Sequence, residues 1–365
     1  MQENPMRISF ARLISSGSLL AALTILIAAP LCGGSASTHL FSESRPAMGT
    51  LFTLYLYAAD QHQASALFEA AFAEIERVEE ALSNYRPSSE LSRINRLAAQ
   101  RPVTTDPEVF AFLERSLDFS RRSAGAFDIT VGQLMRAWGF FRGSGSYPTE
   151  PELARARASV GWRNVVLDKQ ARTVHFTVPG MDLDPGGIGK GYAVDRVVDV
   201  LRESGVRAAL VDAGGSSVYA LGAPPGKEGW IVRVPQPNDK TQAISTLSLR
   251  DTSLSTSGNY EKFFRLGGRL YCHIMDPRTG EPVQGMVQTT VIAPSATDSD
   301  ALSTAVFVLG HDLGRKLLEN FPGASGIWVL DGAQEPRIVT WHWPQTIVSG
   351  VLSQHASVSG RSTNP

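Results

Sequence analysis

The chain has almost no net charge and very little cysteine. Its 365 residues include 34 Lys and Arg against 35 Asp and Glu, which gives a formal net charge of −1. Because the basic residues form no run, the sequence gives no electrostatic case for binding nucleic acid or an acidic membrane surface. Two cysteines, Cys32 and Cys272, are too few for a thiolate zinc site. We expect Cys272, in the segment YCHIMD, to be a strand-core residue rather than a nucleophile.

An apolar run long enough to cross a membrane is also missing. The most apolar segment, LLAALTILIAAPLCGG (19–34), is interrupted by Pro30 and is shorter than the roughly 20 apolar residues of a membrane helix. It follows Arg7 and Arg12 and precedes small residues, which is typical of a secretory signal peptide cut near Ala36. We therefore expect residues 1–36 to be a signal peptide and the mature protein to be periplasmic.

Cys32 is a candidate site for a lipid that would anchor the protein to the inner membrane. The segment APLC that contains it lacks the Leu-small-small-Cys pattern, so soluble release into the periplasm is the favoured expectation. If the signal peptide is removed near Ala36, Cys272 is the cysteine left in the mature chain, and no intramolecular disulfide can form.

Residue patterns in the first half of the mature chain predict helices and a strand. Residues 50–59 alternate and are rich in aromatics, as in a strand, and apolar residues then recur at helical spacing from Ala64 to Leu82. Another helix is expected over about 107–122, and the segment TEPE (149–152) forms a capping box that opens a further one.

From residue 164 onward the patterns become richer in strands. A helix that ends at Gly205 interrupts these strands. A further strand, a polar turn and a helix are expected over 289–310. This interleaving predicts one α+β unit over about 40–345, with mixed or antiparallel sheets and packed helices, followed by a polar tail, 346–365.

The glycine-rich segment DLDPGGIGKGYAVD (182–195) resembles a phosphate loop but matches neither the P-loop nor the dinucleotide fingerprint. We expect MDLD to end a strand at Asp184 and Gly191 to open a helix. The free amides of that helix, its dipole and Lys190 would favour an anion, a phosphate or pyrophosphate above all. A tight strand-to-helix turn with a solvated lysine is the alternative.

A second cluster of polar residues lies in ATDSDALSTAVFVLG (296–310). Asp300 and Thr304 share one face of the expected helix, with Asp298 and Ser303 nearby. All are oxygen donors, which suits a hard cation such as Mg²⁺ rather than zinc. Alternatively, Asp298 or Thr297 is a helix cap and Asp300 is an acidic residue of the first turn.

A histidine and an aspartate surround a turn in YCHIMDPRTGEPV (271–283). Strand alternation places Cys272 and Ile274 on one face, and His273 and Met275 on the other. His273 is a candidate ligand contact or proton carrier, while Asp276 is equally suited to cap the turn. The segment STSGNYEKFF (255–264) offers hydroxyls in a polar turn, with an ordinary loop as the alternative.

Eight segments in order resemble the ApbE family of FAD:protein FMN transferases over roughly residues 45–335. They are RPAMGT (45–50), SNYRPSSELSRIN (83–95), GAFDITVGQLMRAWGF (125–140), DPGGIGKGYAVD (184–195), DAGG (212–215), STSGNY (255–260), HIMDPRTG (273–280) and DALSTAVFVLG (300–310). The resemblance implies an ApbE-like, T-fold-related catalytic unit. It also implies an enzyme that uses Mg²⁺ to cleave FAD, transfers FMN to a Thr or Ser of an exported acceptor flavoprotein, and releases AMP.

The resemblance also implies roles for individual residues. Those expected to contact FAD are Met48, Tyr85, Ala126, Phe127, Asp128, Asp184, Lys190 and His273. Those expected to hold Mg²⁺ are Gly187 through its backbone carbonyl, Asp300, Ser303 and Thr304. His273 and Asp300 are the expected catalytic residues. His273 is the candidate general base, and Asp276 or a metal-side carboxylate is the runner-up. Pro185 follows Asp184 where many relatives have leucine, which leaves the orientation of Asp184 open.

Two other functions remain open at this point. One is an Mg²⁺-dependent FAD pyrophosphatase that gives FMN and AMP, and the other is a periplasmic flavin-binding protein without catalysis. The resemblance suggests that the acceptor is a flavoprotein subunit of an electron-transfer chain. Every version with a metal requires the turn at Gly187 and the helix that begins near residue 300 to meet in space.

Overall fold

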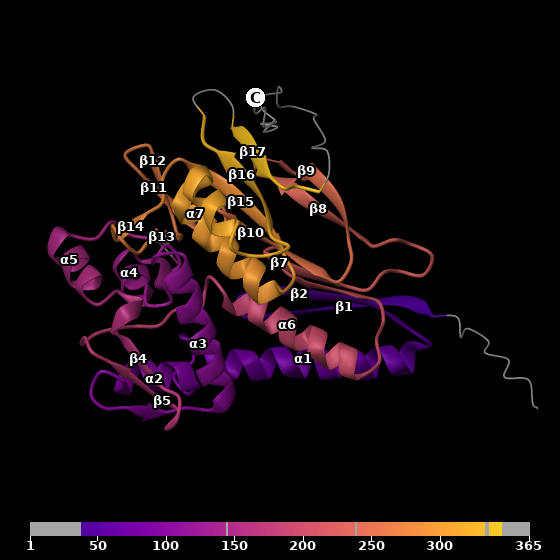
Figure 1. Cartoon of the computed structure of the whole chain (residues 1–365), viewed down its shortest axis with the longest axis horizontal. Helices are drawn as coiled ribbons and strands as arrows, with labels where there is room; N and C mark the ends of the chain where they lie inside the picture. Colours follow the sequence, from indigo (N-terminus) through magenta and orange to yellow (C-terminus); the bar gives the residue numbers. More distant parts are fainter. Residues whose placement is uncertain (1–37, 144, 238, 333–335, 345–365) are drawn as a thin grey trace, which may run out of the picture. The chain divides into compact units, whose positions relative to one another are not determined.

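An antiparallel sheet forms the centre of the fold in the computed structural model, which describes residues 38–143, 145–237, 239–332 and 336–344 (Figure 1). Within these residues the sheet has eight strands in the order β1-β2-β6-β7-β10-β15-β16-β17, and each neighbouring pair is antiparallel. The strands are β1 His39–Ala47, β2 Thr50–Ala58, β6 Ala209–Ala213, β7 Ser217–Leu221, β10 Thr252–Gly258, β15 Met286–Ala293, β16 Ser325–Leu330 and β17 Arg337–Trp341.

Three long helices, α1 Gln61–Leu82, α6 Gly189–Glu203 and α7 Ala296–Leu318, cover one face of this sheet (Figure 1). α1 buries the apolar residues that its periodicity selects: Ala64, Leu67, Phe68, Ala71, Phe72, Ile75, Val78 and Leu82. Burial of this stripe against the sheet and α6 stabilises the helix more than its intrinsic propensity does. The strand expected over 50–59 and this helix are both confirmed.

The opposite face of the sheet is covered by a hairpin of β8 Trp230–Gln236 and β9 Asp239–Leu249. Neighbouring residues of β7 divide between the two sides, because Tyr219 belongs to the core beneath the helices and Val218 to the smaller core beneath the hairpin. This alternation is what a sheet covered on both faces requires.

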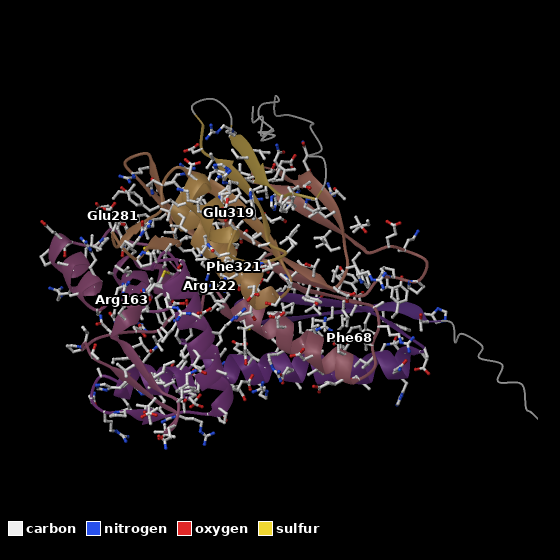
Figure 2. All side chains as sticks on the ribbon, in the orientation of Figure 1. Phe68, Arg122, Arg163, Glu281, Glu319 and Phe321 are labelled. Atoms are coloured by element: carbon white, nitrogen blue, oxygen red, sulfur yellow. The ribbon has the colours of Figure 1, made fainter. Side chains whose placement is uncertain are left out.

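The remaining elements complete the fold beside the glycine-rich segment. They are α2 Glu90–Leu97, α3 Pro107–Arg122, α4 Gly132–Ala137, α5 Glu150–Ala158, the 3₁₀ turns η1 Phe140–Arg142 and η2 Trp162–Asn164, the small sheet of β3 Val103–Thr104, β5 Thr173–Phe176 and β4 Val165–Asp168, and the hairpins β11 Phe263–Leu266/β12 Arg269–Cys272 and β13 Met275–Asp276/β14 Glu281–Pro282. The capping box of Thr149 and Glu152 opens α5 as expected. Figure 2 shows Arg122 at the end of α3 beside Phe321, which follows α7, and the guanidinium lies 3.4 Å from the ring centroid.

The α+β prediction is confirmed, and Cys272 is a buried core residue as expected. Burial raises the pKa of its thiol to about 11, which removes it as a nucleophile at neutral pH. No helix of the described ranges is both long and apolar enough to cross a membrane. The expected signal peptide, Cys32 and the polar tail lie outside the described residues.

Three local expectations were wrong. MDLD forms no strand, because Asp182 makes only an isolated bridge to Val131. α6 begins at Gly189, two residues before Gly191. The strand expected through His273 is broken there, because the chain changes its pairing partner from β11 to β14; Ile274 and Met275 are therefore both buried instead of lying on opposite faces.

A reciprocal exchange of carboxylates joins the starts of α6 and α7. Asp300 of α7 accepts a hydrogen bond from the backbone amide of Gly191 in α6, at 2.8 Å. Asp195 of α6 in turn accepts from the amides of Ala296 and Thr297, the first two residues of α7, at 2.7 and 2.8 Å. Each helix therefore satisfies free amides of the other. Ser295 is the N-cap of α7, so the alternative of a cap at Asp298 or Thr297 was wrong.

We expect Gly191→Ala to destabilise the protein strongly. A Cβ at residue 191 would lie 2.1 Å from the carbonyl oxygen of Ala296, so the two helices would have to separate. The expected loss in the free energy of unfolding is about 3 kcal/mol, measured by urea denaturation. Gly189→Ala is the matched control in the same helix, because its Cβ would meet nothing closer than 3.3 Å. Equal losses in the two variants would contradict the close crossing.

Candidate active site

The turn at Gly187 and the first turns of α7 lie against each other, as a shared metal site requires. The Thr304 hydroxyl donates to the Gly187 carbonyl at 3.4 Å, and a Cβ built on Gly187 would lie 3.1 Å from that hydroxyl. Asp300, one turn earlier on the same face of α7, is tied to Gly191 as described above. The helix crossing therefore brings together a carbonyl, a carboxylate and a hydroxyl from two distant parts of the sequence.

Asp300 is a buried acid that lies near Lys190. Its side chain is buried, and this burial raises the pKa of its carboxyl, while Lys190 and the Gly191 amide act in the opposite direction. A carboxylate so poorly solvated favours a cation nearby. Within the described ranges no three His, Cys, Asp or Glu side chains come together, so a cation here would rely on one carboxylate with carbonyl and hydroxyl oxygens. This all-oxygen donor set fits a hard divalent cation such as Mg²⁺.

Ser303 is the least available of the four residues expected to bind the metal. Its hydroxyl donates to the carbonyl of Asp300 at 2.9 Å and pairs with the Ser257 hydroxyl at 2.9 Å. Its side chain is fully buried against β10. One lone pair of its oxygen remains for a metal. The main role of Ser303 is therefore to bond α7 to the sheet.

The amides that open α6 are mostly used within the protein. The Gly189 amide donates to the carbonyl of Pro185 at 2.7 Å, and the Gly191 amide donates to Asp300. The expectation that free helix-end amides would bind the anion is therefore wrong for these two groups. The half-exposed ammonium of Lys190 is the cationic group that this end of α6 offers to a phosphate.

Asp184 is buried beside the same turn. Its carboxylate accepts from the Gly186 amide at 2.8 Å, and burial raises the pKa of its carboxyl. Lys262 and Asn84 lie close enough to lower that pKa in part. Among the described residues, Nδ2 of Asn84 nevertheless completes no hydrogen bond of normal geometry, although it is buried. An unsatisfied buried amide next to Asp184 is a group that a bound ligand would satisfy.

Met48 occupies a strained turn above the glycine-rich segment. It joins β1 to β2 with φ of 49°, followed by Gly49 at 72°, so a methionine stands at a left-handed position. Its amide donates to Glu79 at 2.9 Å. A Cβ built on Gly189 would lie 3.7 Å from its terminal methyl, so the side chain reaches the start of α6. Such strain is typical of functional positions.

Tyr85 presents an exposed aromatic surface near this turn. Its ring stacks on Phe141 with centroids 4.3 Å apart and planes 9° apart, and 55% of the residue remains exposed. The guanidinium of Arg136 also lies over the Phe141 ring, at 3.7 Å from the centroid, and it pairs with Asp182. The group offers a flat surface on which a planar ring can stack.

The GAFD segment shapes the site from beneath. Ala126 and Phe127 are buried, and the Phe127 ring would lie 3.3 Å from a Cβ on Gly187. The carboxylate of Asp128 accepts from the amide and hydroxyl of Thr130 and from the Trp162 amide. These three bonds hold the loop, so the role of Asp128 as a flavin contact stays a prediction.

One ring nitrogen of His273 is unprotonated at neutral pH. Its Nδ1 lies 3.2 Å from the carbonyl of Lys262, which can only accept, so Nδ1 bears the proton and Nε2 has the free lone pair. Burial, with Lys190 and Lys262 nearby, lowers the pKa of the imidazole to about 4. Asp276, the alternative base, is bound by two guanidinium nitrogens of Arg278 at 2.8 Å each. The geometry therefore favours His273 as the proton acceptor.

The comparison with protein families follows the same segments. A model described as the ApbE family matches residues 48–328. The chain belongs to the ApbE family. The identification made from the ordered motifs is thereby confirmed.

Proteins of the ApbE family resemble this chain over most of its length. A relative named FAD:protein FMN transferase from Treponema pallidum is 35% identical over 325 residues, which cover 84% of this chain and 89% of the relative. One with the same name from Klebsiella pneumoniae is 33% identical over 293 residues, 80% of this chain and 89% of the relative.

Solved ApbE structures share the fold. The ApbE protein of Thermotoga maritima superimposes with a TM-score of 0.74 and 32% identity, covering 82% of this chain and 96% of that one. The flavinyl transferase ApbE of Pseudomonas stutzeri, in its apo form, gives a TM-score of 0.74 and 30% identity, covering 83% and 95%.

Sequence reasoning missed three residues of this ApbE site. Asn84 directly precedes Tyr85, and its position in the quoted SNYRP segment was the available signal. Lys262 lies in the polar segment 255–264, which offered no sign that its carbonyl would orient His273. Asp195 looked like an ordinary polar residue of a helix, because its partners are about 100 residues away.

We expect the His273 ring to titrate near pH 4, well below its ordinary value of 6.5. Between pH 6.5 and about 4, this histidine is protonated in the unfolded chain but not in the folded chain. It therefore lowers the free energy of unfolding as the pH falls through this range. Ring NMR shifts followed against pH measure the pKa.

Lys190→Gln should raise the pKa of His273, because it removes a neighbouring cation. Lys169→Gln, at an exposed lysine that pairs with Glu114, should leave that pKa unchanged. A His273 that titrates at its ordinary value in the unaltered protein would contradict the assigned environment.

Proposed function

We propose that this ApbE-family chain is a FAD:protein FMN transferase. It binds FAD, cleaves the diphosphate, joins FMN through a phosphoester to a Thr or Ser hydroxyl of an acceptor protein, and releases AMP. The observation that carries the proposal is the junction at which Thr304 contacts Gly187 and Asp300, one helical turn earlier, contacts Gly191. Lys190 lies close to the carboxylate of Asp300. The names of the relatives support the same activity.

Mg²⁺ is the metal proposed for this junction. The Gly187 carbonyl, the Asp300 carboxylate and the Thr304 hydroxyl would hold it, with Ser303 behind them. When bound, Mg²⁺ neutralises charge on the diphosphate and polarises its phosphorus–oxygen bonds. Asp300 is the residue on which this site depends most, since it supplies the negative charge.

Two other groups of the chain act directly on the diphosphate and the acceptor. The ammonium of Lys190 stabilises the charge that develops on the phosphoryl oxygens. Nε2 of His273 takes the proton of the acceptor hydroxyl while the oxygen of that hydroxyl forms a bond to the FMN phosphorus. The bond from that phosphorus to the bridging oxygen breaks, and AMP leaves with the bridging oxygen. His273 then gives its proton to water, which restores the neutral ring.

The remaining predicted contacts orient FAD rather than react with it. The exposed face of Tyr85 is suited to stack on a planar ring of the dinucleotide, and Met48 packs over the start of α6 where the diphosphate would lie. Asp184 and the unsatisfied Asn84 amide offer hydrogen-bonding groups on the same side of the turn. Correct placement of the diphosphate beside Lys190 depends on these contacts.

We also propose that the enzyme works in the periplasm on an exported flavoprotein subunit of an electron-transfer chain. The support is the signal-peptide pattern of residues 1–36, which lie outside the described structure. Release of the mature chain is favoured over a lipid anchor at Cys32.

Mass spectrometry of a co-expressed acceptor tests the transfer directly. We expect the acceptor to gain the mass of FMN less water at a Thr or Ser, and an equal amount of AMP to appear. His273→Ala should still bind FAD but transfer FMN about 10² to 10⁴ times more slowly, because the general base is lost. Asp276→Asn, at the residue held by Arg278, should transfer at nearly the normal rate. Free FMN with no modified acceptor would instead identify a pyrophosphatase, and bound FAD with no product a flavin-binding protein.

We expect Asp300→Asn to lose the Mg²⁺-dependent cleavage of FAD. The amide keeps the size of the side chain and can still accept from Gly191, but it removes the charge that holds the cation. A loss of 10²-fold or more in kcat/KM is expected, from FMN release at several Mg²⁺ concentrations. Asp298→Asn is the control on the same helix, because Asp298 pairs with Arg115. Undiminished activity of Asp300→Asn that also resists a chelator would disprove the metal site.

A further inference from the structure

The face of β10 that lies against α7 is lined with hydroxyls instead of apolar side chains. Ser253, Ser255 and Ser257 alternate along the strand, so they share one face, and Leu254 between them belongs to the apolar core on the other side of the sheet. Ser253 and Ser255 are completely buried. A strand covered by a helix normally presents apolar residues at such positions, so these serines call for a reason.

Each of these serines is bonded to α7. Ser253 and Ser255 lie 2.8 and 2.6 Å from the hydroxyl of Ser299, and Ser257 lies 2.9 Å from that of Ser303. We call these five residues the hydroxyl seam. Ser299 and Ser303 are one helical turn apart, and each immediately precedes a residue of the candidate metal site, Asp300 or Thr304. The seam and the metal-binding residues therefore occupy adjacent stripes of the same two turns of α7.

The seam extends toward Asp300 through β7. The Ser255 hydroxyl donates to that of Ser217 at 3.0 Å, and Ser217 lies close enough to Asp300 to favour its charged form. On the other side, Thr289 of β15 donates to the carbonyl of Ser303 at 2.8 Å. Three strands thus hold the start of α7 through oxygen atoms.

Packing alone does not account for this arrangement. Buried hydroxyls gain little net stability from bonding to one another, and replacing both partners with apolar groups of similar shape is often neutral or stabilising. Apolar contacts have no preferred direction, whereas a hydrogen bond between hydroxyls fixes both distance and angle. A helix held by such bonds has its rotation and depth against the sheet set within narrow limits.

We propose that the hydroxyl seam consists of positioning residues that set the first two turns of α7 so that Asp300 and Thr304 face Gly187. The inference rests on the proposed metal site, and it adds residues that neither touch substrate nor bind the cation, Ser303 apart. Removing the seam should weaken metal binding while leaving the packing of α7 intact.

The test measures the affinity for Mn²⁺ alone, by electron paramagnetic resonance, in purified full-length protein. Ser255→Ala, and separately the triple variant Ser253→Ala, Ser255→Ala and Ser299→Ala, should bind Mn²⁺ about 10-fold more weakly, the size expected when groups that orient a metal ligand are lost. The melting temperature of the triple variant should stay close to that of the unaltered protein, because the variant removes both hydroxyls of the Ser253–Ser299 and Ser255–Ser299 pairs. Ser217 and the carbonyls of Val218 and Ala296 each lose one donor. The Mg²⁺ concentration that half-saturates FAD cleavage should rise in parallel.

Ser116→Ala is the matched control. Ser116 is also fully buried, but its hydroxyl bonds only to the Phe112 carbonyl in its own helix. It should leave the Mn²⁺ affinity unchanged. Unchanged affinity in the triple variant, an equal loss in Ser116→Ala, or no Mn²⁺ binding by the unaltered protein would each overturn the proposal. Weaker Mn²⁺ binding in the seam variants supports it even if no acceptor is ever flavinylated, so failure of the transferase function remains distinguishable.

Discussion

The crossing of α6 and α7 at Gly191 is the constraint on which the site depends. The helices approach so closely that only a hydrogen atom fits between residue 191 and the Ala296 carbonyl. At this distance Asp300 and Asp195 each reach amides of the opposite helix, which satisfies groups that would otherwise be buried without partners. The same contact fixes the glycine-rich turn relative to α7, so the helix pair and the candidate metal site are one structural unit.

The charges of the site are controlled by how deeply its acidic side chains are buried. Asp184 and Asp300 are buried acids, and Lys190 and Lys262 lie near one or the other of them. The two lysines also disfavour a charged His273. The imidazole therefore stays neutral with two cationic groups close to it. The lowered pKa keeps Nε2 unprotonated and able to accept a proton at neutral pH, and it also makes the imidazole a weaker base than an exposed histidine.

Local patterns predicted a large part of the fold and of the site, but not the long-range contacts. The stripe of α1 and the capping box of α5 are complete within a few residues, so periodicity and spacing sufficed. The break at His273 depends on pairing with β14, which no local pattern encodes. The motifs predicted roles for Asp300 and Gly187. Ser255 and Ser257 of β10 looked like part of a polar turn, because their partners on α7 lie more than 40 residues away.

The turn between β1 and β2 places a methionine where glycine would be more comfortable. A left-handed backbone costs a side-chain-bearing residue of order 1 kcal/mol, and in exchange a flexible thioether rests on the opening residues of α6. A glycine in place of Met48 would relieve the backbone strain of the β1–β2 hairpin, but it would remove the side chain that covers Gly189. At this turn, backbone stability and the ligand contact proposed for Met48 therefore make opposite demands, and we expect selection for thermal stability alone to replace this methionine.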